Sequence, residues 1–275
     1  MMVGDVVGKV GRLAVQEWLP ILKEQHEVDF IVVNGENSAA GIGITPDIAS
    51  GLLGRDGVDV VTLGNHAWGK REIYPYLDQQ PRLLRPANYP PGSPGSGFGV
   101  YERSGFTVGV VSIQGRTFME PVDDPFRVID EILLTLSRKT RIIFIDFHAE
   151  ATSEKQAFGW YLDGRVSAVV GTHTHVQTAD ERILPQGTAY LTDVGMTGPV
   201  DSIIGMRKDI VIPRFTSGLP ARFEVADGDS QLNAVLVDID VETGSALMIQ
   251  RIQVPSHATT RPASPAGRNN VSARS

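Results

Sequence analysis

Short apolar runs alternate with polar loops and stretches of helical spacing along the first 70 residues. Residues 1–7, 30–33 and 58–63 are rich in β-branched and aliphatic side chains, which is typical of buried strands. Apolar residues recur at helical spacing over residues 10–22, and Thr45-Pro46 is a helix start with proline in the first position. The pattern predicts repeated strand–helix–strand units and a largely parallel sheet.

The rest of the chain is more mixed. Residues 84–99 are rich in proline and glycine and predict a surface loop. Two helices are predicted, over residues 125–138 and 153–162, with Ser153 as the N-cap of the second. Further strands are predicted at residues 106–113, 141–147, 166–170 and 189–192, and a closing antiparallel pair at 232–239 and 246–254 with its turn at 242–244.

Polar residues with metal-binding side chains follow five of these predicted strands. In a parallel sheet the ligand lies beyond the carboxyl ends of the strands, so side chains from separate strand ends can meet there. In the last of these loops two histidines stand two residues apart, and on an extended loop such residues point the same way. The candidates are Asp5, Glu36, Asn37, Asn65, His66, His148, His173 and His175.

Each candidate also has an ordinary structural interpretation. Asp5 before a helix suits an N-cap, Asn65 suits a turn, and His148 suits a hydrogen-bonded histidine at a strand end. Their joint occurrence at five strand ends favours a common site. Imidazole and carboxylate ligands suit Mn, Fe or Zn, and a carboxylate such as Glu36 can bridge two ions.

Composition narrows the choice of function. The 275-residue chain has a formal net charge of -7, which argues against a general nucleic-acid binder. It contains no cysteine, so any metal must be held by nitrogen and oxygen. We find neither an apolar stretch of the roughly 20 residues that a membrane span requires nor a signal-peptide pattern, and therefore expect a cytoplasmic protein. Only three residues precede Gly4, fewer than an average strand of roughly five to six, so the sequence leaves open whether Met1 is the native start.

The longer motifs resemble the calcineurin-like metallophosphoesterase superfamily, and in particular its YmdB-like branch. The resemblance extends over nearly the whole chain. It rests on Gly4-Asp5-Val6-Val7-Gly8, Asn34-Gly35-Glu36-Asn37 with Ser38-Ala39-Ala40-Gly41, Gly64-Asn65-His66, Phe147-His148-Ala149-Glu150-Ala151-Thr152, Gly171-Thr172-His173-Thr174-His175 and Asp193-Val194-Gly195-Met196-Thr197-Gly198. It implies an α/β fold of four layers (α/β/β/α), in which two facing mixed sheets are flanked by helices.

The resemblance also implies a role for each candidate. One metal ion would be held by Asp5, Glu36, Asn37 and His175, and the second by Glu36, Asn65, His148 and His173, with Glu36 as the bridge. His66 would be the general acid near the leaving group. The superfamily pattern begins Asp-x-His, but here Val7 takes the histidine position and Glu36 replaces the usual aspartate. Oxygen from Asn37 in place of imidazole favours iron or manganese over zinc.

The activity that the resemblance implies is metal-dependent hydrolysis of a phosphodiester, with cyclic nucleotides such as 2′,3′-cyclic and 3′,5′-cyclic AMP as substrates. A metal-bridged hydroxide would attack and His66 would protonate the leaving oxygen. The alternatives are a phosphomonoesterase or nucleotidase on the same site, and a nucleotide-sensing regulator of RNA turnover with little catalysis. We expect one domain over residues 1–254 and a disordered tail over 255–275. The sequence leaves the oligomeric state open, a homo-oligomer included.

Overall fold

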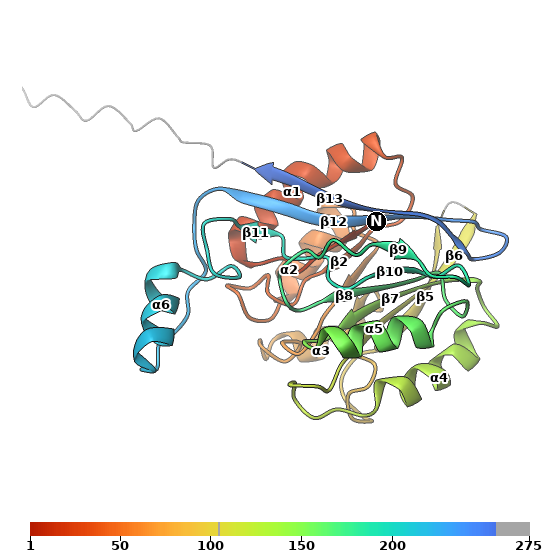
Figure 1. Ribbon diagram of the computed structural model, residues 1–275, viewed down its shortest axis with the longest axis horizontal. Coiled ribbons are helices and arrows are strands. Elements are labelled where there is room, and N and C mark those ends of the chain that lie inside the picture. The colour runs from red at the N-terminus through yellow and green to blue at the C-terminus, as the bar shows by residue number, and fades with distance from the viewer. Residues whose placement is uncertain (104, 257–275) are drawn as a thin grey trace, which may run out of the picture.

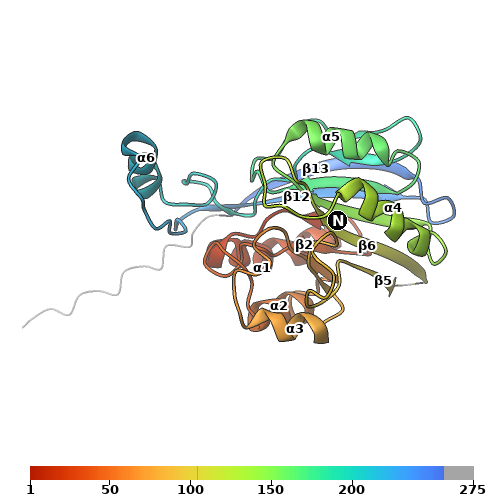
Figure 2. The same cartoon turned by 90° about the horizontal axis from the view of Figure 1, so that it is seen from below.

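Two mixed β-sheets face each other, with helices on their outer sides (Figures 1 and 2). The computed structural model describes residues 1–103 and 105–256. Strands β1 to β4 of the first sheet run parallel, β12 lies antiparallel to β1 on the other side, and β13 pairs with β12. The seven strands of this sheet are β1 (Met2–Val3), β2 (Val32–Asn34), β3 (Val60–Thr62), β4 (Leu83–Leu84), β11 (Gly198–Pro199), β12 (Ser230–Ile239) and β13 (Ala246–Ser256).

The second sheet has a parallel centre and antiparallel edges. Its parallel strands follow the order β6-β7-β8-β10, while β5 and β9 pair antiparallel at the two edges. Its six strands are β5 (Phe98–Arg103), β6 (Phe106–Gln114), β7 (Ile142–His148), β8 (Ala168–Thr172), β9 (Arg182–Ile183) and β10 (Ala189–Leu191).

Three buried apolar clusters hold the four layers together. The first lies between the first sheet and the helices α1 to α3, and includes Leu19, Leu52 and Leu77. The second lies between the second sheet and α4 and α5, and the third fills the space between the two sheets. The predicted α/β architecture of two facing sheets flanked by helices is therefore confirmed. The helices are α1 (Gly8–Gln25), α2 (Pro46–Ser50) with the π-helical turn η1 (Gly51–Arg55), α3 (Ile73–Gln79), α4 (Pro125–Leu136), α5 (Thr152–Tyr161) and α6 (Lys208–Ser217).

Local predictions were mostly confirmed at the level of elements. Thr45 accepts a hydrogen bond from the backbone N–H of Ile48 and Pro46 begins α2, as predicted. The closing antiparallel pair is present as β12 and β13. No helix in the described ranges combines the length and the apolar character needed to cross a bilayer.

Some details differ from prediction. Ser153 is not the N-cap of α5, because the helix already begins at Thr152 and its capping residue is Ala151, which has no side-chain oxygen. The strand expected over residues 1–7 has only two residues, since the chain turns into the polar loop at Gly4. Helix α6, with a single buried residue, was not predicted, because it has no apolar face for periodicity to reveal. The strand β13 extends to Ser256, two residues into the predicted tail, and the rest of that tail lies outside the described residues.

Candidate metal centre

The carboxyl ends of strands from both sheets meet at one place, and all eight predicted site residues lie on these ends. The first sheet contributes five of them from the loops after β1, β2 and β3. In the second sheet, His148 is the last residue of β7, and the remaining two histidines follow β8. The two sheets therefore assemble one site from residues up to 170 positions apart in the sequence.

His148 lies at the centre of one half of the site. Its Nε2 atom lies 2.9 Å from Asn65 Oδ1, 3.1 Å from Glu36 Oε1 and 3.0 Å from His173 Nδ1. Candidate ligand atoms of Glu36, His148 and His173 all lie within 4.8 Å of one another. Four nitrogen and oxygen atoms with lone pairs so close together suit a shared cation.

The other half consists of buried oxygen atoms without partners. In the described part of the chain, Asp5 Oδ1 and Asn37 Oδ1 are buried and have no hydrogen-bond partner, while Glu36 Oε1 contacts imidazole nitrogens, His148 Nε2 at 3.1 Å and His66 Nδ1 at 3.5 Å. A buried carboxylate or amide oxygen without a partner costs about 1–3 kcal/mol or more, so such atoms in a native site indicate an ion. The second oxygen of Asp5 accepts a hydrogen bond from the backbone N–H of His173, which joins the two halves.

The three histidines are oriented as metal ligands are. In each ring, the nitrogen that points away from the site meets an oxygen: His148 Nδ1 lies 2.8 Å from Thr172 Oγ1, His173 Nε2 lies 3.1 Å from Glu150 Oε2, and His175 Nδ1 lies 2.9 Å from the carbonyl oxygen of Ile204. Such contacts fix the tautomer that leaves the other nitrogen free to bind a metal. The residues present therefore fit a metal centre.

His66 lies beside this cluster. Its Nδ1 atom is 3.1 Å from Asn37 Nδ2 and 3.5 Å from Glu36 Oε1, and its side chain is 36% exposed. Because these contacts occupy Nδ1, Nε2 is the ring atom left to exchange a proton with a substrate. The predicted role of His66 as a proton donor requires such a position, with a free ring nitrogen beside the predicted metal ligands.

The electrostatics of the metal-free site follow from burial and from the proximity of charges. Burial alone would lower the pKa of His148, but Glu36 and Asp5 outweigh it and raise the pKa to about 9. Burial raises the pKa of Asp5 to about 6, although His175 and His148 act against this. Burial and the neighbouring His148 charge lower the pKa of His173 to about 3. In the metal-free site, the positive charge of protonated His148 thus replaces part of the charge that a bound cation would bring.

A buried network behind the site connects the two sheets. The carboxylate of Asp146, in the middle of β7, accepts hydrogen bonds from Thr62 Oγ1 at 2.6 Å, Thr172 Oγ1 at 2.7 Å and Asn34 Nδ2 at 3.0 Å. Since Thr172 in turn contacts His148, Asp146 positions this imidazole through one hydroxyl. Sequence analysis missed Asp146, although a lone acidic residue inside a buried apolar strand was the available signal.

A second buried pair holds the loop that carries the two neighbouring histidines. Lys155 donates to Asp193 Oδ2 at 2.7 Å and to the carbonyl of Thr172 at 2.8 Å, while Thr174 donates to Asp193 through its backbone and side chain. These contacts restrain a strained segment, because His173 and His175 have φ angles of 101° and 67°. Lys155 was also missed; its signal was a charged residue on the buried side of α5.

The first residue of the Gly-Asn-His motif must be glycine for steric reasons. A Cβ at Gly64 would lie 2.2 Å from His148 Cδ2 and 2.4 Å from Glu36 Oε2. Only glycine lets the loop after β3 approach the ligands so closely.

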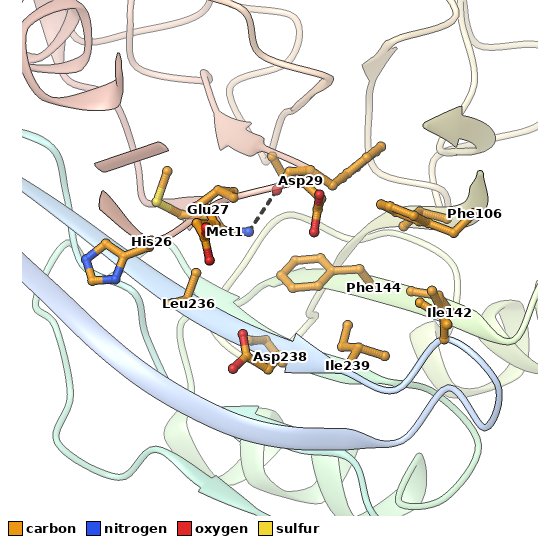
Figure 3. A pocket seen from close by; sticks show the side chains of 16 residues that line it. Met1, His26, Glu27, Asp29, Phe106, Ile142, Phe144, Leu236, Asp238 and Ile239 are labelled. Atoms are coloured by element: carbon orange, nitrogen blue, oxygen red, sulfur yellow. Dashed lines mark hydrogen bonds between the residues drawn. The ribbon is translucent and has the colours of Figure 1, made fainter. Parts of the chain in front are cut away.

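A cavity of about 280 Å³ lies at the opposite, amino ends of the strands (Figure 3). Apolar side chains such as Phe144 and Ile142 form its wall, and His26, Glu27 and Asp238 lie at its edge. None of the predicted site residues lines it, so this cavity is separate from the metal centre.

The comparisons with known proteins agree with this geometry. A family model described as YmdB-like protein matches residues 1–252. The chain belongs to this family. Among its YmdB-like relatives, a 2′,3′-cyclic-nucleotide 2′-phosphodiesterase of Bacillus subtilis is 53% identical over 254 residues, which cover 92% of this chain and 96% of the relative. A putative phosphatase/phosphodiesterase of Mycoplasma genitalium is 34% identical, with 92% of both chains covered.

Solved structures show the same fold. A hypothetical protein from Thermus thermophilus is 43% identical, with a TM-score of 0.87 and coverage of 93% of this chain and 98% of that one. A phosphatase from Mycoplasma pneumoniae is 35% identical, with a TM-score of 0.88 and coverage of 94% and 93%. The YmdB-like assignment and the two-sheet architecture are therefore consistent with each other.

Proposed function

We propose that this YmdB-like protein is a metal-dependent phosphodiesterase that hydrolyses cyclic nucleotides of the 2′,3′-cyclic or 3′,5′-cyclic AMP type. The observation that carries the proposal is the convergence of Glu36, Asn65, His148 and His173 around one point, next to buried oxygens of Asp5 and Asn37 that lack partners. The activity named for the Bacillus subtilis relative, at 53% identity, supports the choice of a cyclic phosphodiester.

Two metal ions are part of the proposal. Asp5, Glu36, Asn37 and His175 would hold one, and Glu36, Asn65, His148 and His173 the other. When bound, such ions polarise the phosphate and lower the pKa of water. We infer iron or manganese rather than zinc, because four of the seven ligand side chains offer oxygen.

The protein's own groups complete the chemistry. Asp146 and Thr172 keep the His148 ring in one orientation, and Glu150 does the same for His173. His66 reaches the solvent-exposed side of the site and gives a proton to the leaving oxygen from Nε2, while the Asn37 amide donates to Nδ1 and so keeps the ring proton on Nε2. The two cations would offset the repulsion between the acidic chain and a phosphate.

The test compares the rates of hydrolysis of 2′,3′-cyclic AMP and p-nitrophenyl phosphate after manganese loading. We expect the diester to be preferred, and His66→Ala to lower kcat roughly 10²- to 10⁴-fold with its metal content unchanged. His26→Ala, a histidine beside the remote cavity, is the matched control and should retain full activity. Preference for the monoester would favour a phosphatase, an activity that the names of the Mycoplasma relatives give beside phosphodiesterase, and absence of turnover with metal bound would favour a nucleotide sensor.

A further inference from the structure

A structured loop of residues 115–124 follows β6, and its middle part lies beside the metal centre. Its first residues are fixed by Glu154, whose carboxylate accepts hydrogen bonds from the backbone N–H groups of Arg116 at 2.9 Å and Thr117 at 3.0 Å. Its two ends are joined by Asn88, which donates to the carbonyls of Gln114 at 2.7 Å and Asp123 at 2.9 Å. Asn88 is buried, so the loop is attached to the core at both ends.

Phe118, in the middle of this loop, has an exposed ring and an unfavourable backbone conformation. Its side chain is 89% exposed, so no part of the described chain covers the ring. Its φ angle is 62°, in the left-handed region where a bulky residue is strained. The protein therefore holds a large aromatic ring in solvent at a conformational cost that packing does not offset. Backbone strain of this kind clusters at ligand-binding and catalytic sites, so it singles out Phe118 among the exposed aromatic residues.

The ring lines a cavity that also reaches the metal centre. The loop and two predicted metal ligands together line this cavity of about 460 Å³, the residues being Phe118, Met119, Glu120, Pro121, Asn65 and His173. Its volume is in the range of small-molecule sites. A molecule that fills it contacts Phe118 together with Asn65 and His173.

The chemistry of the lining indicates which part of a nucleotide lies there. Neither lysine nor arginine lines the cavity, and Glu120 contributes a carboxylate. A second phosphate would be repelled by this carboxylate and would find no cation, whereas an uncharged aromatic group would meet the face of Phe118 and the apolar side chains of Met119 and Pro121.

We propose that Phe118 is a specificity-determining residue that stacks on the nucleobase of the substrate while the cyclic phosphate lies at the metal centre. This inference rests on the proposed function and adds to it a subsite for the base. Stacking is tolerant of sequence because every base has a π-face, so the subsite selects nucleosides over simple diesters without strong preference among bases.

The test compares two cyclic diesters that differ in the base. One is 2′,3′-cyclic AMP, and the other is glycerol 1,2-cyclic phosphate, which has the same five-membered phosphate ring and no base. For Phe118→Ala we expect KM for 2′,3′-cyclic AMP to rise roughly 5- to 100-fold with kcat within about twofold. Glycerol 1,2-cyclic phosphate should be hydrolysed equally well by wild type and variant.

Three further variants separate stacking from a structural role. Phe118→Trp should restore most of the affinity for the nucleotide. Phe118→Gly should weaken it as Phe118→Ala does, yet raise Tm by about 2 °C, since glycine adopts this φ without strain. Phe215→Ala removes a ring that is 81% exposed on α6, which projects away from the sheets. This variant should hydrolyse both substrates as wild type does.

Equal losses on both diesters, or no change in KM for the nucleotide, would overturn the base subsite while leaving the phosphodiesterase proposal intact. If wild type hydrolyses neither diester, the proposed function fails, and calorimetric titration with 2′,3′-cyclic AMP then decides about the subsite. Weaker binding by Phe118→Ala would support it, and equal binding or none by wild type would refute it.

Discussion

The hydrogen-bond network behind the metal centre leads to a specific prediction for Asp146→Asn. In the wild type, Thr172 donates its hydroxyl proton to Asp146 Oδ1, so its oxygen can only accept from His148. The proton on the His148 ring is thereby assigned to Nδ1, and Nε2 is left for a metal. The amide that replaces the carboxylate would be nearly identical in shape, but one of its two terminal atoms would be a donor.

The orientation of the new amide follows from counting contacts. If its oxygen takes the place of Oδ2, it keeps the bonds from Thr62 and Asn34; the reverse orientation would oppose two NH₂ groups at about 3.0 Å. The amide nitrogen therefore faces Thr172, which then accepts from it and donates to His148 Nδ1. The imidazole must carry its proton on Nε2, the atom that faces Glu36 and Asn65.

Asp146→Asn should affect metal affinity more than folding stability. All three hydrogen bonds to the buried carboxylate become bonds with a neutral amide, each weaker by about 1 kcal/mol, while the cost of burying the charge is removed. The net loss should therefore be small beside a typical total stability of about 5–15 kcal/mol. Loss of the correct tautomer, in contrast, should weaken metal binding roughly 10- to 100-fold. We therefore expect a folded protein with a defective centre.

The assay is a chelator competition titration with manganese, accompanied by thermal unfolding of the metal-free protein. Asp59→Asn is the matched control, because Asp59 is also a buried carboxylate that accepts a backbone hydrogen bond and pairs with Arg103, but outside the site. Manganese affinity within twofold of wild type in Asp146→Asn would refute the tautomer argument. An equal loss of affinity in Asp59→Asn would show that the effect is a general consequence of destabilisation.

Two further predictions concern the centre itself. Gly64→Ala places a methyl group about 2.2 Å from the His148 ring, so we expect loss of stoichiometric metal by elemental analysis; normal metal content would show that the loop can move aside. The pKa of His148 is raised from about 6.5 to about 9, so the folded metal-free protein keeps a proton that the unfolded chain loses between these values. Stability gained from this proton is complete below pH 6.5 and lost as the pH rises through 9, by up to about 3 kcal/mol. The buried N-terminal amine, whose pKa burial lowers to about 6, acts in the opposite direction over this range, so urea unfolding should compare chelator-treated wild type with His148→Gln. The stability advantage of wild type should shrink from pH 6.5 to pH 9, and an advantage that grows would contradict the assignment.

The sequence was sufficient for the α/β architecture and for a set of candidate site residues that the structure places at one edge of the two sheets. Strand runs ending in Asp5, Glu36 or His148 indicated a parallel sheet with ligands at its carboxyl ends, because hydrophobic periodicity and the succession of strands and helices along the chain are local properties. Gly64 was part of a motif, but its steric reason became visible only when the loop after β3 was placed against β7.

What the tertiary structure decided is how residues far apart in sequence share one environment. Asp146 contacts Thr62 and Thr172, Lys155 contacts Asp193, and Phe118 lies beside Asn65 only because two sheets and a loop meet at one edge. The direction of a hydrogen bond, the pKa of a buried group and the exposure of a ring depend on neighbours in space. The sequence by itself therefore determined which side chains are available for chemistry, and the packing of the two sheets determined their contacts, their charges and the cavity beside them.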